Sequence, residues 1–144
     1  MPLGFVKRYY RDDAARNPDW LYVFGDNHLR KGDGGQAYHM RGEPNAVGVR
    51  TKMTPGEFFG NDPAEVVAQN KMIDDDMKPL FAHLLKGGVV IWPSDGIGTG
   101  LSEMPRYAPR SFEHMKQKLA ALVRVGKLFT KNVGAAAAEA QPHL

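Results

Sequence analysis

Hydrophobic positions along the chain gather into short apolar runs that are separated by amphipathic stretches. Three runs, at residues 21–24, 46–49 and 89–92, consist mainly of strand-forming residues. The third contains no polar residue, which is typical of a strand covered on both faces. An earlier run at residues 6–10 predicts an opening strand, and Gly25 is expected to end the strand that begins at residue 21.

A long helix is predicted between the second and third of these strands. Asp62 supplies a capping carboxylate, and Pro63 suits the first helical position. Apolar residues then recur at three- and four-residue steps over residues 73–85, which places them on one helix face. Because residues 74–76 are three aspartates that offer a second start, either one long helix or two successive helices fit the pattern.

Shorter elements complete the prediction. Residues 17–19 indicate a polar turn, and residues 34–40 have room for one or two helical turns. A last helix is expected from about Pro109 and should end by Gly126. Residues 134–144 have no packing face, so we expect a single domain over residues 1–133 followed by a mobile tail.

Strands that alternate with helices predict an α/β fold. We expect a three-layer α/β/α sandwich with a mixed, largely parallel sheet. Its central neighbouring strands should be residues 21–24, 46–49 and 89–92. In such a sheet, ligands bind beyond the carboxyl ends of the strands.

Composition narrows the function classes. The chain has 42% hydrophobic and 24% charged residues, as a folded globular protein does. It has no cysteine, which excludes disulfides, thiolate catalysis and cysteine zinc sites, and fits a cytoplasmic protein. No apolar run approaches the roughly 18 residues of a membrane span. The net charge of +3 leaves a nucleic-acid-binding domain as a third hypothesis.

Three segments that follow predicted strands contain residues suited to binding phosphate. Glycine backbones approach a phosphate closely, and a basic residue at a strand end can neutralise its charge. If the strands are parallel, these segments meet at one edge of the sheet. The candidate ligand-binding residues are Gly25, Asn27, Gly32, Gly34, Gly35, Gln36, Arg50, Lys52, Ser94, Gly96, Ile97, Gly98, Thr99, Gly100 and Leu101.

A hydrolase that acts on a nucleotide linkage is the alternative hypothesis. Asp26, Asp33 and Asp95 follow the same strands, and crowded carboxylates can provide a general acid. As ordinary turn residues they would instead bond nearby loop amides. Neither a P-loop nor a nucleophile-elbow motif is present. We expect no bound metal and no cofactor.

The two glycine-rich loops resemble those of macro domains. Asn27 followed by residues 32–35 resembles the loop that faces the distal ribose and diphosphate of ADP-ribose, and residues 99–105 resemble the second, phosphate-embracing loop. The resemblance implies a macro-domain-like fold, ADP-ribose or a related NAD-derived nucleotide as ligand, and a ribose contact from Asn27. Residues 36–37 are Gln and Ala where hydrolytic members carry a catalytic acid.

Longer motifs resemble a small phage and bacterial family of unknown activity. They are GDN at residues 25–27, GGQA at 34–37, MRGEPNAVG at 40–48 and DGIGTGL at 95–101. They extend over most of the chain, and their glycines coincide with the candidate phosphate loops. The sequence therefore favours a nucleotide-binding domain, with a small nucleotide as the partner.

Overall fold

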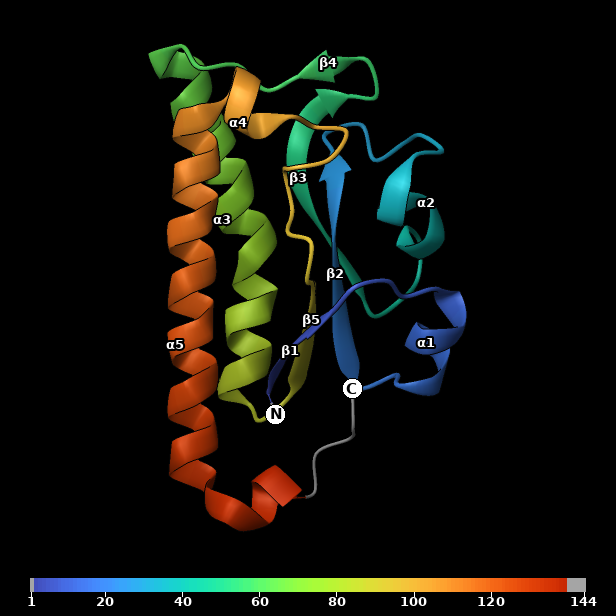
Figure 1. Cartoon of the computed structure of the whole chain (residues 1–144), viewed down its shortest axis with the longest axis vertical. Coiled ribbons are helices and arrows are strands. Elements are labelled where there is room, and N and C mark those ends of the chain that lie inside the picture. Colours follow the sequence, from blue (N-terminus) through green and yellow to red (C-terminus); the bar gives the residue numbers. More distant parts are fainter. Residues whose placement is uncertain (1, 140–144) are drawn as a thin grey trace.

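The computed structural model of the chain describes residues 2–139, and the side chains of residues 2–128. In this part of the chain, five strands form one sheet in the order β1-β5-β2-β3-β4 (Figure 1). The strands are β1 (Leu3–Val6), β2 (Trp20–Asn27), β3 (Ala46–Thr54), β4 (Glu57–Phe58) and β5 (Val89–Pro93). The helices are α1 (Arg11–Arg16), α2 (Gly35–Met40), α3 (Pro63–Leu85), α4 (Met104–Tyr107) and α5 (Pro109–Glu139).

The sheet is mixed and largely parallel, as predicted. Strand β5 pairs in parallel with both β1 and β2, and β2 pairs in parallel with β3. Only the two-residue strand β4 runs antiparallel, against the end of β3. The three strands expected at the centre, β5, β2 and β3, are neighbours in the sheet.

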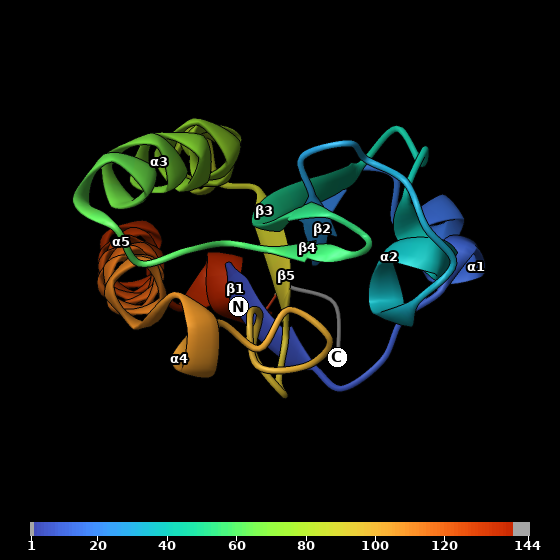
Figure 2. The same ribbon diagram turned by 90° about the horizontal axis from the view of Figure 1, so that it is seen from above.

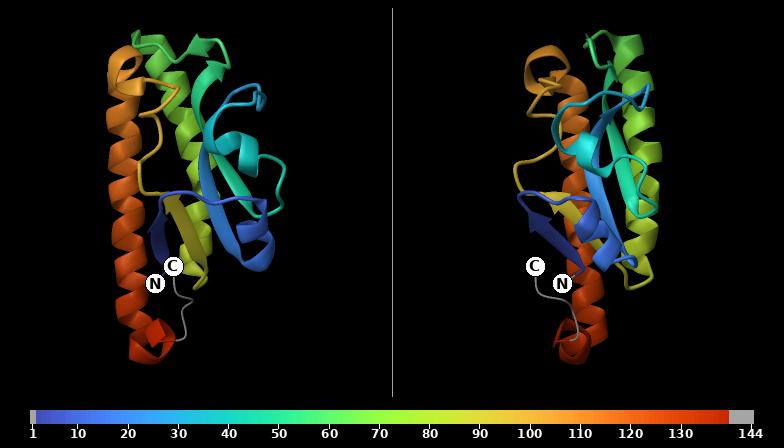
Figure 3. Two further views of the ribbon diagram at one scale, coloured as in Figure 1. Left: turned by 45° about the vertical axis from the view of Figure 1, so that its right-hand side comes forward. Right: turned by 90° about the vertical axis from the view of Figure 1, so that its right-hand side faces the viewer.

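Helices lie on both sides of the sheet. Helices α3 and α5 run side by side along one face, whereas α1 and α2 lie against the other (Figures 2 and 3). Alternate residues of β2 divide between these two sides. Val23 packs in a core with Ile73 of α3 and Leu122 of α5, whereas Phe24 packs with Ala37 of α2. The residues of β5 divide in the same way, with Val90 in the first core and Ile91 in the second, so both faces of this strand are covered, which explains its purely apolar sequence.

The opening of the chain differs from the prediction. Strand β1 ends at Val6 instead of beginning there, and a short helix, α1, occupies residues 11–16, for which the sequence predicted no element. The predicted strand at residues 6–10 is wrong because Tyr9 is buried without belonging to a strand: its hydroxyl donates to the Val23 carbonyl across the face of the sheet. Helix α1 buries only Ala14 and so has no helical hydrophobic pattern.

Two central strands continue beyond the predicted ends. Strand β2 passes through Gly25 and reaches Asn27, because residues 25–27 stay paired with β3. Strand β3 continues to Thr54 and turns back into β4, which the sequence pattern did not predict. The polar residues at the ends of β2 and β3 predict loops, but in the structure they pair with residues of the neighbouring strands.

Helix α3 is one continuous helix. Asp62 and Glu65 form a capping box at its start, with Pro63 in the first turn. The aspartates at residues 74–76 do not start a second helix. Asp74 pairs with His114 of α5, and Asp76 pairs with arginines at the edge of the sheet.

The predicted end of the last helix is wrong. Helix α5 continues through Gly126, where a β-carbon would lie only 3.3 Å from Leu3 Cβ. Gly126 thus allows the helix to pass close to β1 and does not terminate it. The expected tail begins inside α5, and residues 140–144 lie outside the described residues. No helix within residues 2–139 is both long and apolar enough to cross a membrane.

Candidate functional site

A cavity of about 730 Å³ lies at the carboxyl ends of β2, β3 and β5. Its walls include the β2–α2 loop (residues 28–34) and the β5–α4 loop (residues 94–103), which Figure 1 shows at the same end of the sheet. All but three of the predicted site residues line it. The exceptions are Arg50, Ser94 and Thr99.

The β2–α2 loop is closed by Asn27. The side-chain nitrogen of Asn27 donates to the Lys31 carbonyl at 2.5 Å, and its side-chain oxygen accepts from the Lys31 amide at 3.4 Å. Within the described residues, the backbone N–H groups of residues 32–34 donate no hydrogen bond. The side chain expected to face a ribose therefore holds its own loop, while the amides of residues 32–34 have no partner among the described residues.

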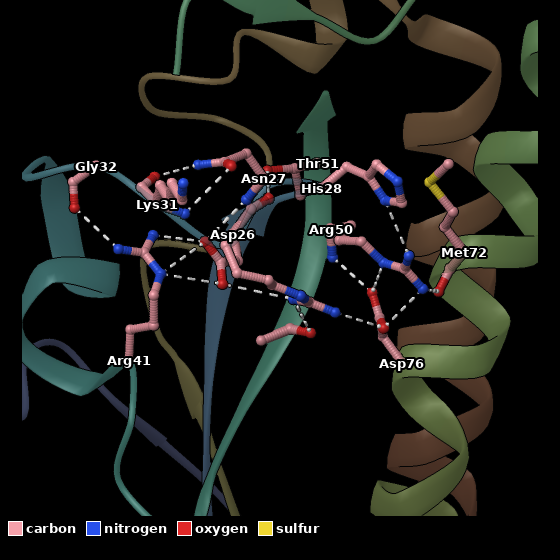
Figure 4. Close-up of polar contacts among 12 residues, drawn as sticks. Asp26, Asn27, His28, Lys31, Gly32, Arg41, Arg50, Thr51, Met72 and Asp76 are labelled. Atoms are coloured by element: carbon pink, nitrogen blue, oxygen red, sulfur yellow. Dashed lines mark hydrogen bonds and ion pairs between the residues drawn. The ribbon is translucent and has the colours of Figure 1, made fainter. Parts of the chain in front are cut away.

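Asp26 is the buried centre of the site, with a side chain only 1% exposed. Arg41 covers it: Nη2 lies 2.5 Å from Oδ1, and Nε lies 3.2 and 3.3 Å from the two carboxylate oxygens. The remaining Arg41 nitrogen, Nη1, donates to the Gly32 carbonyl at 2.8 Å. Figure 4 shows Arg41 between the carboxylate and the loop.

The ion pairs continue from Asp26 around the edge of β3. Arg30 lies 3.5 Å from Asp26 and 3.0 Å from Asp76 of α3, and it donates to the Gly48 carbonyl. Arg50 binds Asp76 through Nε at 2.9 Å, and its backbone amide donates to the same carboxylate at 2.8 Å (Figure 4). Arg50 therefore binds Asp76 at the edge of β3 with both its backbone and its side chain, and it does not line the cavity.

The β5–α4 loop resembles the β2–α2 loop in having free amides. Within the described residues, the N–H groups of residues 97–102 donate no hydrogen bond. Thr99 bonds the Asp95 carbonyl and so closes the turn. Gly98 has φ +90°, and a β-carbon there would lie 2.7 Å from Met104 Sδ. The fold itself therefore requires glycine at this position.

The two loops touch. A β-carbon at Gly34 would come within 2.7 Å of Leu101 Cδ1, and Gly34 itself has an extended backbone with φ −95°. Glycine at this position makes room for the Leu101 side chain and is not required by the backbone conformation. Leu101 is 68% exposed although it bridges the loops.

Charged groups around the cavity differ in their partners. Among the described side chains, Lys7, Arg8 and Lys31 line the cavity and form no hydrogen bond or ion pair. The side chains of Asp33 and Asp95 also line it without such partners. Three cations and two carboxylates that have no partner among the described residues therefore line the cavity. In the described part of the chain, no group of three or more His, Asp or Glu residues could hold a metal ion.

Gln36 fixes one wall of the cavity. Its side-chain amide pairs with the backbone of Tyr9, donating to the carbonyl and accepting from the N–H at 3.3 Å. Gln36 therefore joins α2 to the β1–α1 connection (residues 7–10).

The phenol of Tyr9 lies in the same part of the fold. Burial raises its pKa, and the neighbouring Tyr22 adds to the rise.

The sequence prediction missed several lining residues. The main ones are Lys7, Arg8, Lys31 and Arg41. Arg41 belongs to the motif at residues 40–48, which was a signal that this segment contributes to the site. Lys7 and Arg8 carried no signal, because they lie in a segment that was predicted to be a strand.

The match to known protein families covers the whole of this cavity. Residues 4–118 match the model of a family of unknown function, DUF7831. The chain belongs to this family. Since the matched region runs from β1 into α5, the DUF7831 region contains both loops and every lining residue from Lys7 to Ser102. No curated protein and no solved structure matches the chain.

Proposed function

We propose that the cavity binds a phosphate-bearing nucleotide of the ADP-ribose type. The observation that carries this proposal is the pair of glycine-rich loops that face one cavity with unpartnered amides at residues 32–34 and 97–102. Backbone N–H groups in such loops form concave sites for anions. The diphosphate lies between the loops in this proposal, and Lys31 neutralises part of its charge.

The size of the cavity supports a whole nucleotide as the ligand. Small-molecule sites usually measure about 300–1,000 Å³, and this cavity of about 730 Å³ falls within that range. Tyr10 and His39 line it together with Ile97. They provide apolar and aromatic surface for a base or a ribose, apart from the loop amides.

A macro-domain-like three-layer arrangement is part of the same proposal. Its support is the order of elements: each glycine-rich loop follows a central parallel strand and leads into a short helix. Helices on both sides of the sheet agree with it (Figure 2). A cytoplasmic location, in keeping with the lack of cysteine, completes the proposal.

Hydrolysis of a nucleotide linkage is the second candidate function. Asp33 and Asp95 favour it, because their carboxylates line the cavity without a protein partner. Asp26 is not part of this proposal, since Arg41 and Arg30 already occupy its oxygens. Turnover of an ADP-ribosyl ester that stops in Asp33→Asn or Asp95→Asn would support it, whereas unchanged turnover in both variants would remove these residues from any mechanism.

Thermal unfolding with a panel of ligands tests the binding proposal. ADP-ribose, NAD, AMP and ATP are compared with adenosine, which lacks phosphate. A ligand at a hundredfold excess over its Kd stabilises the fold by about 2.7 kcal/mol, which raises the melting temperature measurably. A shift with the phosphate-bearing compounds and none with adenosine supports the phosphate loops. No shift with any nucleotide overturns the proposal, and binding of DNA that falls steeply with salt would indicate a nucleic-acid partner instead.

A further inference from the structure

We infer that Arg41, held by Asp26, and Asn27 are positioning residues that orient the peptide groups of the β2–α2 loop before a ligand is bound. The inference rests on the proposed function, in which the amides of this loop hold a phosphate. The three side chains lie in the wall of the cavity itself.

Two successive carbonyl groups of the loop are held from the protein side. The Lys31 carbonyl accepts a hydrogen bond from Asn27 Nδ2 at 2.5 Å. The next one, that of Gly32, accepts from Arg41 Nη1 at 2.8 Å (Figure 4). Two side chains from separate segments of the chain thus fix neighbouring peptide planes.

Fixing a carbonyl also fixes the amide of the following residue. In a trans peptide the C=O and the next N–H point in opposite directions, because the unit is planar, and the described residues contain no cis peptide. The N–H groups of Gly32 and Asp33 therefore point away from Asn27 and Arg41. Neither donates to a group in the described part of the chain, so both are available to an anion.

Most of the hydrogen-bonding groups of Arg41 are already used within the protein. Its Nε and Nη2 bind the buried Asp26 carboxylate, which also attracts Arg30 from the other side. A guanidinium fixed in this way has one nitrogen left, and that nitrogen binds the Gly32 carbonyl. Arg41 therefore acts on an anion through the loop.

The loop needs such a restraint. Gly32 has φ +117° and Gly35 has φ +64°, so glycines stand at both ends of the segment. Glycine loses more conformational freedom on ordering than any other residue. A loop that is ordered in advance spares a ligand that entropic cost, which increases affinity without any new contact.

Backbone ¹⁵N relaxation without nucleotide tests the inference in Arg41→Lys. Lysine keeps the positive charge, but its single nitrogen cannot span Asp26 and Gly32 as a guanidinium does. Arg50→Lys is the matched control. Arg50 likewise binds a buried aspartate, Asp76, and a backbone carbonyl, that of Met72, but it lies outside the cavity.

The order parameters of residues 32–34 should fall in Arg41→Lys from about 0.85, typical of rigid backbone, to below about 0.6. They should keep their wild-type values in Arg50→Lys. Unchanged order parameters in Arg41→Lys overturn the inference, and so does an equal fall in both variants, which would indicate general loosening. If Arg41→Lys does not fold, Asn27→Ala is measured instead, because it removes the other carbonyl anchor.

Titration of the same proteins with ADP-ribose separates this inference from the proposed function. Arg41→Lys should weaken ADP-ribose binding at least about tenfold, and Arg50→Lys should leave it unchanged. A loosened loop with unchanged affinity overturns the positioning role. If the wild-type protein binds no nucleotide, the proposed function fails, and the relaxation data alone decide whether Arg41 orders the loop.

Discussion

The side chain of Leu101 lies directly over Gly34, so that a β-carbon at Gly34 would come within 2.7 Å of Leu101 Cδ1. Through this contact the β5–α4 loop meets the β2–α2 loop beside the cavity. Because Leu101 is largely exposed and its end is flexible, a side chain added at Gly34 would displace it at little cost. A substitution at Gly34 therefore reports on the contact between the loops as well as on the ligand.

A substitution at Gly100 tests ligand binding more directly than one at Gly34. It lines the cavity, its backbone is outside the left-handed region, and a β-carbon there would meet nothing within 4 Å. Gly100→Val should fold normally and weaken nucleotide binding at least about tenfold, or about 1.4 kcal/mol, because the new side chain occupies space beside the loop amides. Calorimetric titration measures the affinity.

Gly56 provides the matched control for this substitution. It also has open space around its β-carbon position and an ordinary backbone, but it lies in the turn between β3 and β4 and does not line the cavity. Gly56→Val should change neither the melting temperature nor the affinity. Equal affinities for wild type and Gly100→Val would place the ligand away from the β5–α4 loop.

Asp76 and Asp75 are neighbours on α3 with very different environments. The side chain of Asp76 is 8% exposed and binds Arg30 and Arg50, whereas that of Asp75 is 40% exposed and pairs with lysines on the same helix. Asp76→Asn should lower the free energy of unfolding by about 2–3 kcal/mol, because Arg50 loses its counter-charge and Arg30 keeps only the longer contact with Asp26.

Asp75→Asn is the control for this change and should leave the urea midpoint nearly unchanged, since exposed ion pairs contribute little. Urea unfolding followed by circular dichroism measures both variants. If the two substitutions had equal effects, the network around the edge of β3 would not stabilise the fold.

Stability should fall at alkaline pH because of Tyr9. Burial raises the pKa of Tyr9 above its ordinary value of 10.0, so the folded protein keeps the phenol proton at a pH where the unfolded chain releases it. The stabilisation is complete below about pH 10 and is lost as pH rises through the window above it. The slope is about 1.4 kcal/mol per pH unit for each such group.

Tyr9→Phe should reduce this slope, measured as the urea midpoint at successive pH values from 9 to 11. Part of the slope should persist, because burial also raises the pKa of Tyr22. Tyr38→Phe, at a half-exposed position on α2, is the control and should keep the wild-type slope. A pH dependence that is the same in all three proteins would exclude Tyr9 as its source.

The elements with strong local signals could be predicted from the sequence. The apolar run at residues 89–92 is the buried strand β5, and Trp92 at its end is 1% exposed. Asp62 and Pro63 mark the start of α3 correctly, because capping depends on adjacent residues. Helix α1 could not be predicted, since it buries only Ala14.

The position of the cavity could also be predicted, because parallel strands bring their carboxyl ends to one edge of the sheet. The roles of single side chains could not. Asp26 and Arg41 are 15 residues apart and pair only when α2 folds back on β2. Arg50 was expected at the cavity, but it binds Asp76, 26 residues later, around the open edge of β3. Such pairings depend on tertiary packing that no local pattern records.

Asn27 separates two explanations of the site. The sequence predicts a contact with the distal ribose of ADP-ribose, whereas the structure places the Asn27 amide on the Lys31 backbone. If the amide serves the loop, Asn27→Ala should weaken ADP-ribose and AMP by the same factor, at least about tenfold, because both ligands place phosphate against the loop.

Calorimetric titration of Asn27→Ala with both nucleotides gives the ratio of the two losses. Asn61→Ala is the control: Asn61 accepts a hydrogen bond from the Arg110 amide and lies outside the cavity, so this variant should bind both nucleotides normally. AMP lacks the distal ribose, so a larger loss for ADP-ribose than for AMP would restore the ribose contact. Equal losses assign Asn27 to the loop, and the phosphate then binds to amides that Asn27 and Arg41 hold in place.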